Sequence, residues 1–170
     1  MNLKGKIRII PDFPKEGISF KDITTLLKEG SAFQEAIFQL AQLCEGKEFD
    51  VIAAPEARGF MIGAPLAYSL GAGFIPVRKL GKLPGETISA QYELEYGTDW
   101  LEMHQDAIKP GQKVLIVDDL LATGGTIFAT IDMVKRLQGE IVGLAFLIEL
   151  TELKGRSNLA EYDVISLIKY

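Results

Sequence analysis

The apolar run V-L-I-V at residues 114–117 constrains the fold most strongly, because apolar and polar residues do not alternate within it. Such a run is typical of a central parallel strand that helices cover on both faces. It ends in Asp118 and Asp119, and apolar residues recur at helical spacing from Ile127 onward. In open α/β sheets, ligands bind beyond the carboxyl ends of the strands. The segment therefore predicts a strand, a ligand-binding loop and a helix.

The loop between this strand and the helix has the composition of a phosphate site. Gly124 and Gly125 let the backbone approach a ligand closely, and Thr123 and Thr126 add hydroxyl donors. We expect residues 124–126 to open the helix, whose first N–H groups attract a phosphate dianion. The alternative is an ordinary threonine-capped helix beside two acids that only favour the helix dipole. The spacing matches neither G-x-x-x-x-G-K-[ST] nor G-x-G-x-x-G.

Composition limits the classes of protein to which the chain can belong. Its 170 residues suffice for one domain with one core, and its 48% hydrophobic and 24% charged residues are ordinary for a globular protein. A net charge of −5 argues against a broad nucleic-acid surface, so no nucleic-acid partner is expected. No apolar run approaches a membrane span, and Pro11 interrupts the N-terminal stretch before a signal peptide could form. These features predict a cytoplasmic protein without a membrane partner.

The single cysteine and the single histidine offer neither a disulfide nor a transition-metal cluster. Cys44 lies on an apolar helical stripe and is expected to be a buried small side chain. His104 has no evident partner in the sequence, which favours an exposed residue over a catalyst.

Strand and helix signals alternate along most of the chain. Strands are expected at residues 7–10, 51–54, 74–77, 141–150 and 164–168, and a helix at residues 59–70. Apolar residues at helical spacing mark a further helix from Phe33 to Cys44, with Ser31 and Gln34 as a capping box at its start. The alternation predicts an α/β fold, with a parallel-rich twisted sheet flanked by helices. No repeat or linker interrupts it, so residues 1–170 are expected to form one domain.

Residues 80–97 break the alternation. They contain several glycines and no helical period, yet apolar and polar residues alternate from Ile88 to Tyr96. Period two predicts a half-exposed strand in an antiparallel hairpin. On the pattern alone, a static surface hairpin and a mobile lid are equally compatible with this segment.

The stretch V-L-I-V-D-D-L-L-A-T-G-G-T resembles the phosphoribosyl pyrophosphate signature of type I phosphoribosyltransferases. The resemblance implies that Asp118 and Asp119 bind the 2′ and 3′ hydroxyls of the ribose. It also implies that the loop holds the 5′-phosphate through Ala122, Thr123, Gly124, Gly125 and Thr126. These enzymes carry a flexible catalytic loop at the place of residues 80–97, which favours the lid.

Other segments narrow the resemblance to the adenine phosphoribosyltransferases, over essentially the whole chain. The stretch I-P-D-F-P-K-E-G-I-S-F-K-D-I at residues 10–23 is similar to their adenine-binding segment, and P-E-A-R-G-F at residues 55–60 to their pyrophosphate loop. R-K-L-G-K-L-P-G and Y-E-L-E-Y-G, within residues 78–97, are similar to their catalytic loop. Ala122 stands where enzymes for 6-oxopurines typically carry an aspartate. The resemblance implies a small N-terminal hood at residues 1–30 that binds the base, and a lid at residues 80–97.

The activity implied is transfer of the phosphoribosyl group of phosphoribosyl pyrophosphate to adenine, giving AMP and pyrophosphate in purine salvage. Glu95 and Arg58 are the implied catalytic residues, with Glu95 exchanging a proton at adenine N7 while N9 attacks the sugar. Magnesium, held mainly by the substrate rather than by protein ligands, is the implied cofactor.

The resemblance also implies the remaining contacts and a homodimer. Adenine is expected to contact the backbone of Ser19 and Lys21, the ring of Phe20, and Leu120 as the opposite apolar wall. The expected pyrophosphate contacts are Arg58, Arg78, Lys79 and Lys82. Arg78 is expected to reach into a neighbouring subunit, as in dimeric relatives.

Two alternatives stay open at this point. One is a phosphoribosyltransferase for another purine, such as xanthine, because backbone recognition of a base leaves no side-chain code. The other is a non-enzymatic regulator that senses phosphoribosyl pyrophosphate and binds DNA. The regulator would need a DNA-binding segment or a basic face, for which this acidic chain leaves little room.

Overall fold

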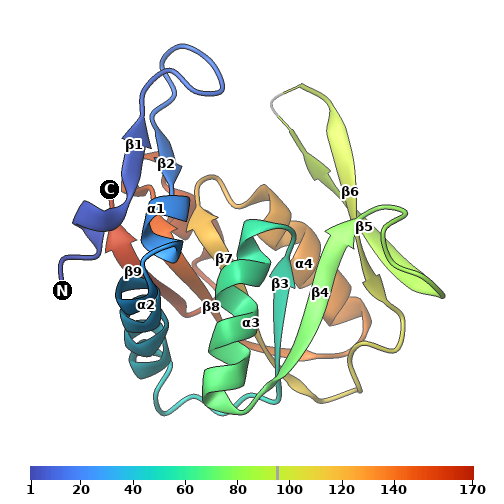
Figure 1. Ribbon diagram of the computed structural model, residues 1–170. Helices are drawn as coiled ribbons and strands as arrows, with labels where there is room; N and C mark the ends of the chain where they lie inside the picture. Colours follow the sequence, from blue (N-terminus) through green and yellow to red (C-terminus); the bar gives the residue numbers. More distant parts are fainter. Residues whose placement is uncertain (95) are drawn as a thin grey trace.

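A seven-stranded sheet lies at the centre of the protein (Figure 1). The computed structural model describes residues 1–94 and 96–170. The strands follow the order β5-β6-β4-β3-β7-β8-β9. Their bounds are β3 (Val51–Pro55), β4 (Gly73–Lys79), β5 (Thr87–Glu93), β6 (Thr98–His104), β7 (Lys113–Leu121), β8 (Glu140–Glu149) and β9 (Val164–Lys169). Strands β4, β3, β7, β8 and β9 are parallel, and β6 is antiparallel to both β4 and β5. The predicted α/β class with a parallel-rich sheet is confirmed.

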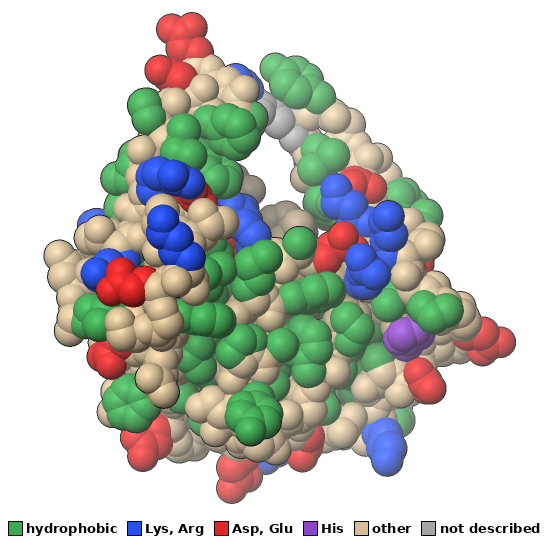
Figure 2. Space-filling view, viewed as in Figure 1, with side chains coloured by type: hydrophobic (Ala, Val, Ile, Leu, Met, Phe, Trp, Pro, Cys, Tyr) green, Lys and Arg blue, Asp and Glu red, His purple; other side chains and the backbone are tan. Residues whose placement is uncertain are grey.

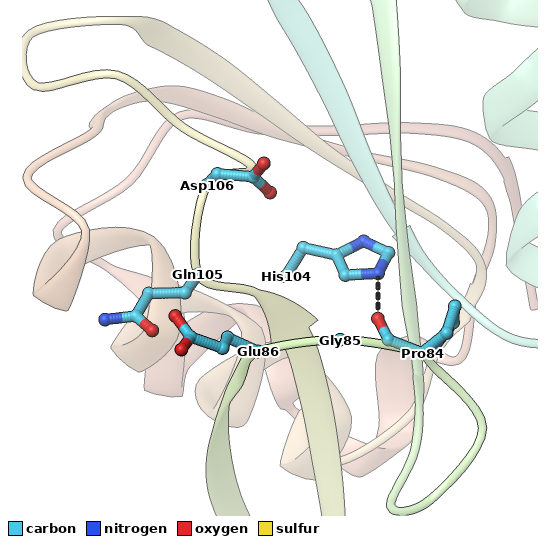
Figure 3. A pocket seen from close by; sticks show the side chains of 6 residues that line it. All are labelled: Pro84, Gly85, Glu86, His104, Gln105 and Asp106. Carbon is cyan, nitrogen blue, oxygen red and sulfur yellow. Dashed lines mark hydrogen bonds between the residues drawn. The ribbon is translucent and has the colours of Figure 1, made fainter.

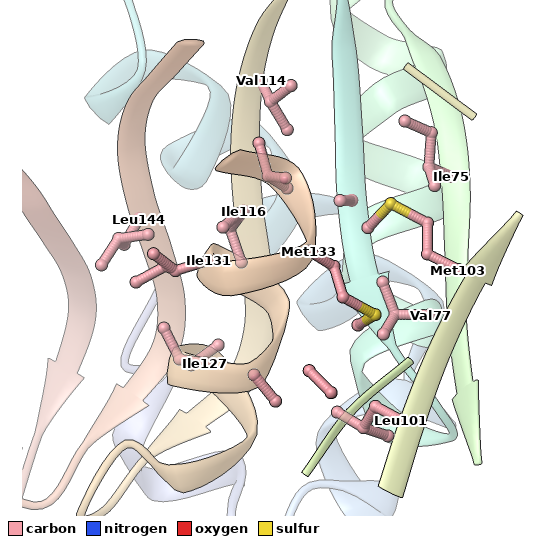
Figure 4. Packing of buried hydrophobic residues seen from close by; sticks show 14 of the residues in the cluster. Ile75, Val77, Leu101, Met103, Val114, Ile116, Ile127, Ile131, Met133 and Leu144 are labelled. Atoms are coloured by element: carbon pink, nitrogen blue, oxygen red, sulfur yellow. The ribbon is translucent and has the colours of Figure 1, made fainter. Parts of the chain in front are cut away.

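Strand β7 sends alternate side chains into two cores, as the apolar run at residues 114–117 predicts. Val114 and Ile116 pack in the core under helix α4 (Gly125–Arg136). Figure 4 shows the side chains of α4 pointing onto this face of the sheet. Leu115 and Val117 pack in the opposite core, under helices α2 (Gly30–Leu43) and α3 (Arg58–Leu70). A strand that is apolar on both faces therefore lies between two helical layers, and its carboxyl end carries the two acids to the edge of the sheet.

A two-stranded antiparallel sheet, β1 (Arg8–Ile10) with β2 (Phe20–Asp22), projects above the main sheet on the side opposite the β5–β6 hairpin (Figure 1). A 3-10 turn, η1 (Lys4–Lys6), precedes it and the short helix α1 (Thr24–Leu27) follows it. Asp22 joins the strands to this helix, because it accepts hydrogen bonds from the Thr24 hydroxyl at 2.7 Å and from Arg8 Nε at 2.9 Å. These bonds, the one from Thr24 first, lower the pKa of Asp22 to about 2.

The C-terminal part of the chain returns beside this projection. Two 3-10 segments, η2 (Thr151–Leu153) and η3 (Gly155–Leu159), connect β8 to β9. Lys4 Nζ then donates a hydrogen bond to the Lys169 carbonyl at 2.6 Å, which ties the two ends of the chain together. Within the described residues, no helix combines the length and the apolar character needed to span a bilayer.

The predicted strands and helices each lie on an observed element, but three details were wrong. Helix α2 begins at Gly30 with Glu29 as its N-cap, so Ser31 is already helical and no side chain forms the expected capping box. Strand β5 ends at Glu93, and the apolar side chains of Leu94 and Tyr96 beyond it are exposed. The sequence analysis also did not identify β6, whose place depends on pairing with both β4 and β5.

Candidate active site

The two acids at the end of β7 are both buried. Asp118 is 8% exposed and Asp119 is 5% exposed, and the Asp119 backbone N–H donates to Asp118 Oδ1 at 2.8 Å. Burial, and then the neighbouring Asp119 carboxylate, hold the pKa of Asp118 well above its usual range. Gly59, at the start of α3, lies against this pair, since a Cβ there would be 2.9 Å from Asp118 Oδ1. The edge of the sheet thus presents two crowded carboxyl groups.

Arg58 connects these acids to the N-terminal projection. Its Nε lies 3.0 Å from Asp119 Oδ2, and its guanidinium carbon lies 5.1 Å from the centre of the Phe20 ring. Phe13 packs edge-on against Phe20, with ring centres 5.1 Å apart. Asp119 Oδ2 is buried and accepts no hydrogen bond from the described residues, because the Arg58 N–H is close to it but is not directed at it. An open acceptor therefore remains at the centre of the site.

The loop after β7 turns directly into α4. Gly124, at the N-cap, has φ of 98°, a left-handed conformation that favours glycine, and among the described residues no side chain caps the helix. The first N–H groups of α4 are therefore available to a ligand. A Cβ on Gly125 would lie 3.5 Å from the Glu93 carbonyl, so the end of β5 rests against the start of this helix. The prediction that residues 124–126 open a helix is confirmed.

Figure 2 shows an open gap between the N-terminal projection and the β5–β6 hairpin, with Lys and Arg side chains on both sides of it. The two projections approach each other at their tips, where Lys15 Nζ lies 5.4 Å from the centre of the Tyr96 ring. Phe20 belongs to β2 of the N-terminal projection, and Arg58 is the first residue of α3. The arrangement is a concave site open on two sides.

The basic residues at the end of β4 are held by acids of this chain. Arg78 Nε donates to Glu56 Oε1 at 3.1 Å, and the Lys79 backbone N–H donates to the same oxygen at 2.8 Å. Lys79 Nζ lies 3.7 Å from Asp99 Oδ2 on β6. The loop between β3 and α3 and the end of β4 therefore share one carboxylate.

Lys82 lies in the exposed loop that follows β4, and the buried Glu102 of β6 anchors that loop. Glu102 Oε1 accepts the Leu83 backbone N–H at 2.7 Å. Burial favours a raised pKa for Glu102, but hydrogen bonds from the backbone of Leu83, Gly81 and Lys82 outweigh it, so the pKa lies below its usual range. The charged carboxylate thus fixes the loop that carries Lys82.

Comparisons with known proteins agree with this geometry. The model of the phosphoribosyl transferase domain family matches residues 21–169. A relative from Clostridium tetani, named adenine phosphoribosyltransferase, is 64% identical over 170 residues, which are all of this chain and 99% of the relative. This chain belongs to the adenine phosphoribosyltransferase family.

Solved structures of the family have the same fold. The crystal structure of the enzyme from Thermoanaerobacter pseudethanolicus is 62% identical, with a TM-score of 0.97 over 99% of this chain and 98% of that one. The enzyme from Saccharomyces cerevisiae, whose structure contains adenine and an imino-altritol bisphosphate, is 42% identical, with a TM-score of 0.89 over 95% of this chain and 94% of that one. The similarity therefore covers the core and both projections.

The predicted site residues fall into two groups. The structure brings together Phe20, Arg58 and Asp119 by direct contact. Other predicted residues have different partners: Arg78 pairs with Glu56 of its own chain, and Lys21 Nζ bonds to Ser19 Oγ at 2.8 Å and lies 4.9 Å from the centre of the Tyr170 ring. Leu120 is half-buried and packs against the core under α2 and α3. Glu95 lies outside the described residues.

Sequence reasoning missed Gly59, Glu56 and Glu102 as parts of the site. Gly59 and Glu56 belong to P-E-A-R-G-F, and their positions directly after a buried strand were a usable signal. Glu102 had no such signal, because its role depends on a strand pairing that no local pattern indicates.

The prediction that His104 is exposed and without a partner was wrong. Its ring nitrogen Nε2 lies 2.9 Å from the Pro84 carbonyl, and the residue is half-buried. Figure 3 shows this contact at the edge of a hollow of about 680 Å³, lined by residues 84–86 and 104–106. Residues 84–86 belong to the segment predicted as the lid, but none of the lining residues is a predicted ligand contact, so His104 lies at the base of the hairpin.

The end of β8 lies beside the loop of β7 and carries a strong ion pair. Leu121 is in register with Glu149, and Leu150 N donates to the Leu121 carbonyl at 3.0 Å. Glu149 accepts hydrogen bonds from Arg156 Nε at 2.9 Å and from Arg156 Nη2 at 2.6 Å. The Arg156 guanidinium, more than any other group, lowers the pKa of Glu149 from 4.5 to about 2.

Replacing Glu149 by Gln should lower the free energy of unfolding, and the loss should depend on pH. A folded-state pKa below the unfolded value stabilises the protein above about pH 4.5, and this contribution disappears as the pH falls towards about 2. Urea unfolding at about pH 7, 5 and 3 should therefore show the gap between wild type and E149Q narrowing with acid. The exposed Glu152, changed to Gln, is the control. A gap of constant size would contradict the assigned ion pair.

Proposed function

We propose that the protein transfers the phosphoribosyl group of phosphoribosyl pyrophosphate to adenine, releasing AMP and pyrophosphate in purine salvage. The observation that carries the proposal is the junction of Phe20, Arg58 and the buried Asp118–Asp119 pair above an uncapped helix start. It offers an aromatic ring, a cation, carboxylates that can accept hydrogen bonds from ligand hydroxyls, and a loop suited to phosphate, in one concave site. Relatives with 59–64% identity over the whole chain carry the name adenine phosphoribosyltransferase, which favours adenine over xanthine or a regulatory role.

The carboxylates and the loop are proposed to bind the ribose 5-phosphate part of the substrate. Asp119 Oδ2 is a buried acceptor that receives no hydrogen bond from residues 1–94 and 96–170, and a ribose hydroxyl would supply a donor. Asp118 is proposed to bind the neighbouring hydroxyl. The 5′-phosphate is proposed to lie at the start of α4, on Ala122, Thr123, Gly124, Gly125 and Thr126, where N–H groups and hydroxyls meet an anion.

Adenine is proposed to stack on Phe20, with Leu120 as the opposite wall and the backbone of Ser19 and Lys21 pairing with its polar edge. The Lys21 side chain points to Ser19 and Tyr170, which leaves backbone groups as the recognition elements of that residue. Residues 1–30 are accordingly proposed to form the base-binding hood of one domain covering residues 1–170. Residues 80–97 are proposed to form its lid, and the contact between Lys15 and Tyr96 supports closure of hood and lid over the site.

The pyrophosphate is proposed to bind Arg58, Arg78, Lys79 and Lys82. Arg58 offers a planar guanidinium for bidentate contact with phosphate oxygens, and the lysines act as point charges. Magnesium is the proposed cofactor, and when bound it neutralises charge on the departing pyrophosphate. The described residues contain no group of three or more His, Cys, Asp or Glu side chains suited to a metal, which fits an ion held mainly by substrate oxygens and water.

The chemical step is displacement at the anomeric carbon of the ribose. Departure of pyrophosphate develops oxocarbenium character at that carbon while adenine N9 attacks it. Glu95 is proposed to exchange the proton at adenine N7, because a positioned carboxyl group contributes most in a site from which water is excluded. Ala122 cannot handle a proton, so this role falls to another residue.

The activity is tested by measuring AMP formation from adenine, phosphoribosyl pyrophosphate and magnesium. We expect turnover with adenine and at least ~100-fold lower kcat/KM with hypoxanthine, guanine or xanthine, because a site that pairs with one polar edge rejects a base with the wrong donors. Removal of magnesium with a chelator should abolish turnover, and added magnesium should restore it. Turnover with xanthine equal to that with adenine would overturn the choice of base, and absence of all turnover would overturn the enzyme.

Two variants should separate binding from chemistry. Arg58→Ala should weaken the binding of phosphoribosyl pyrophosphate by about tenfold or more, with little change for adenine, because it removes a bidentate phosphate contact. Glu95→Ala should keep that binding and lower kcat about 100-fold. Calorimetric titration and steady-state kinetics make the comparison. Equal losses for both substrates in R58A, or unchanged turnover in E95A, would remove that residue from its role.

A homodimer is also proposed, and a cytoplasmic location stays a prediction. Phe38, Met61 and Tyr68 are 56%, 43% and 92% exposed on the outer sides of α2 and α3. Phe38 and Tyr68 line an apolar hollow of about 370 Å³ between these helices. Large exposed apolar side chains that gather in this way mark interaction surfaces.

Light scattering should therefore give a mass near twice 18.7 kDa. Tyr68→Glu should shift it towards the monomer, because a charge in an apolar interface is costly. Lys28→Glu, an exposed change outside this hollow, is the control. A wild-type mass of 18.7 kDa would contradict the dimer, and an unshifted dimer in Y68E would place the interface elsewhere.

A further inference from the structure

The 3-10 segment η3 lies directly behind the loop that follows β7. A Cβ on Gly155 would lie 2.2 Å from the Ala122 carbonyl oxygen and 3.0 Å from Leu121 Cδ1. The backbone of Gly155 does not have a positive φ, so contact rather than conformation requires glycine there. At the other end of η3, Leu159 is fully buried, and its Cδ1 lies 4.0 Å from the position of a Cβ on Gly124. The segment therefore supports the loop at two points.

Arg156 holds this segment in place. Besides its two hydrogen bonds to Glu149, it donates to the Val164 carbonyl at 2.6 Å and to Ser166 Oγ at 3.0 Å. One side chain thus ties η3 to the ends of β8 and β9. Leu121, where the loop after β7 begins, is in register with Glu149 of β8. Because Arg156 binds Glu149, η3 and the start of this loop are attached to the same end of the sheet.

The contact at Gly155 determines the direction of one peptide group. In a trans peptide, the C=O and the N–H point in opposite directions. The Ala122 carbonyl oxygen faces Gly155, so the Thr123 N–H in the same peptide points away from η3. An added methyl group at residue 155 would push the carbonyl and turn this N–H.

We propose that Gly155 and Arg156 are positioning residues for the phosphate loop: Gly155 sets the orientation of the Ala122–Thr123 peptide, and Arg156 fixes Gly155. The proposal rests on the function proposed above, since it takes the 5′-phosphate to bind at this loop. Neither residue contacts the ligand. A misplacement of well under an ångström in such a donor is enough to weaken an anion site, because the hydrogen bonds depend steeply on distance and angle.

The test compares the binding of AMP and adenosine, which differ only in the 5′-phosphate, by calorimetric titration of the whole protein. Gly155→Ala should weaken AMP binding about tenfold or more and leave adenosine binding within about twofold. Asn158→Ala, an exposed change in the same 3-10 segment, is the control and should change the binding of neither ligand. A purely structural role for Gly155 would affect both ligands alike or only the free energy of unfolding.

The outcomes separate this inference from the proposed function. If wild type binds AMP no more tightly than adenosine, the loop is not a phosphate site and the function fails. If wild type prefers AMP and folded G155A keeps that preference, the positioning role of Gly155 is overturned. Should G155A lose its cooperative unfolding transition, Arg156→Lys gives the same comparison, because lysine cannot make both bonds to Glu149. A folded R156K with an unchanged AMP preference then overturns the proposal.

Discussion

Two carboxyl groups buried side by side at the end of β7 are the constraint on which the site depends. Burial removes the water that would solvate Asp118 and Asp119, and the Asp119 carboxylate makes ionisation of Asp118 more costly, which raises the pKa of Asp118. The chain offsets this cost with few groups: a backbone N–H donates to Asp118, and the Arg58 cation lies beside Asp119. The result is a site that is incompletely satisfied by the protein. A ligand with hydroxyl donors next to an anionic group completes it, which is why the geometry and the proposed substrate agree.

Small residues on either side of the loop allow this crowding. Gly59 lies against Asp118, and Gly155 lies against Ala122, so a methyl group at either position would displace a functional atom. Ion pairs then hold the loops that carry these glycines, through Glu149 with Arg156 and Glu56 with Arg78. The positions of the residues proposed to contact the ligand therefore depend on packing and ion pairs behind them.

Local sequence was enough for the central strand, the loop and the start of α4, because their signals lie within a dozen adjacent residues. It was also enough to place Arg58 after a buried strand. It failed for β6 and for Glu102, because that strand is defined by partners far away in the chain. The partner of His104 was missed for a related reason, because Pro84 comes close only after the sheet has assembled. The capping box at Ser31 failed because α2 begins at Gly30, with Glu29 as its N-cap, so Ser31 already lies inside the helix.

By itself, the sequence determined the fold class, the two-faced burial of β7 and the helix start after its loop, since strand burial and helix starts follow from residue order over short distances. The tertiary structure alone decided which groups meet. It brought Phe20 of the N-terminal projection onto Arg58 and set Gly155 behind Ala122. It also left one Asp119 oxygen without a hydrogen bond from the part of the chain that the structure describes. These contacts join residues that are dozens of positions apart, and their geometry depends on how the layers pack rather than on any local pattern.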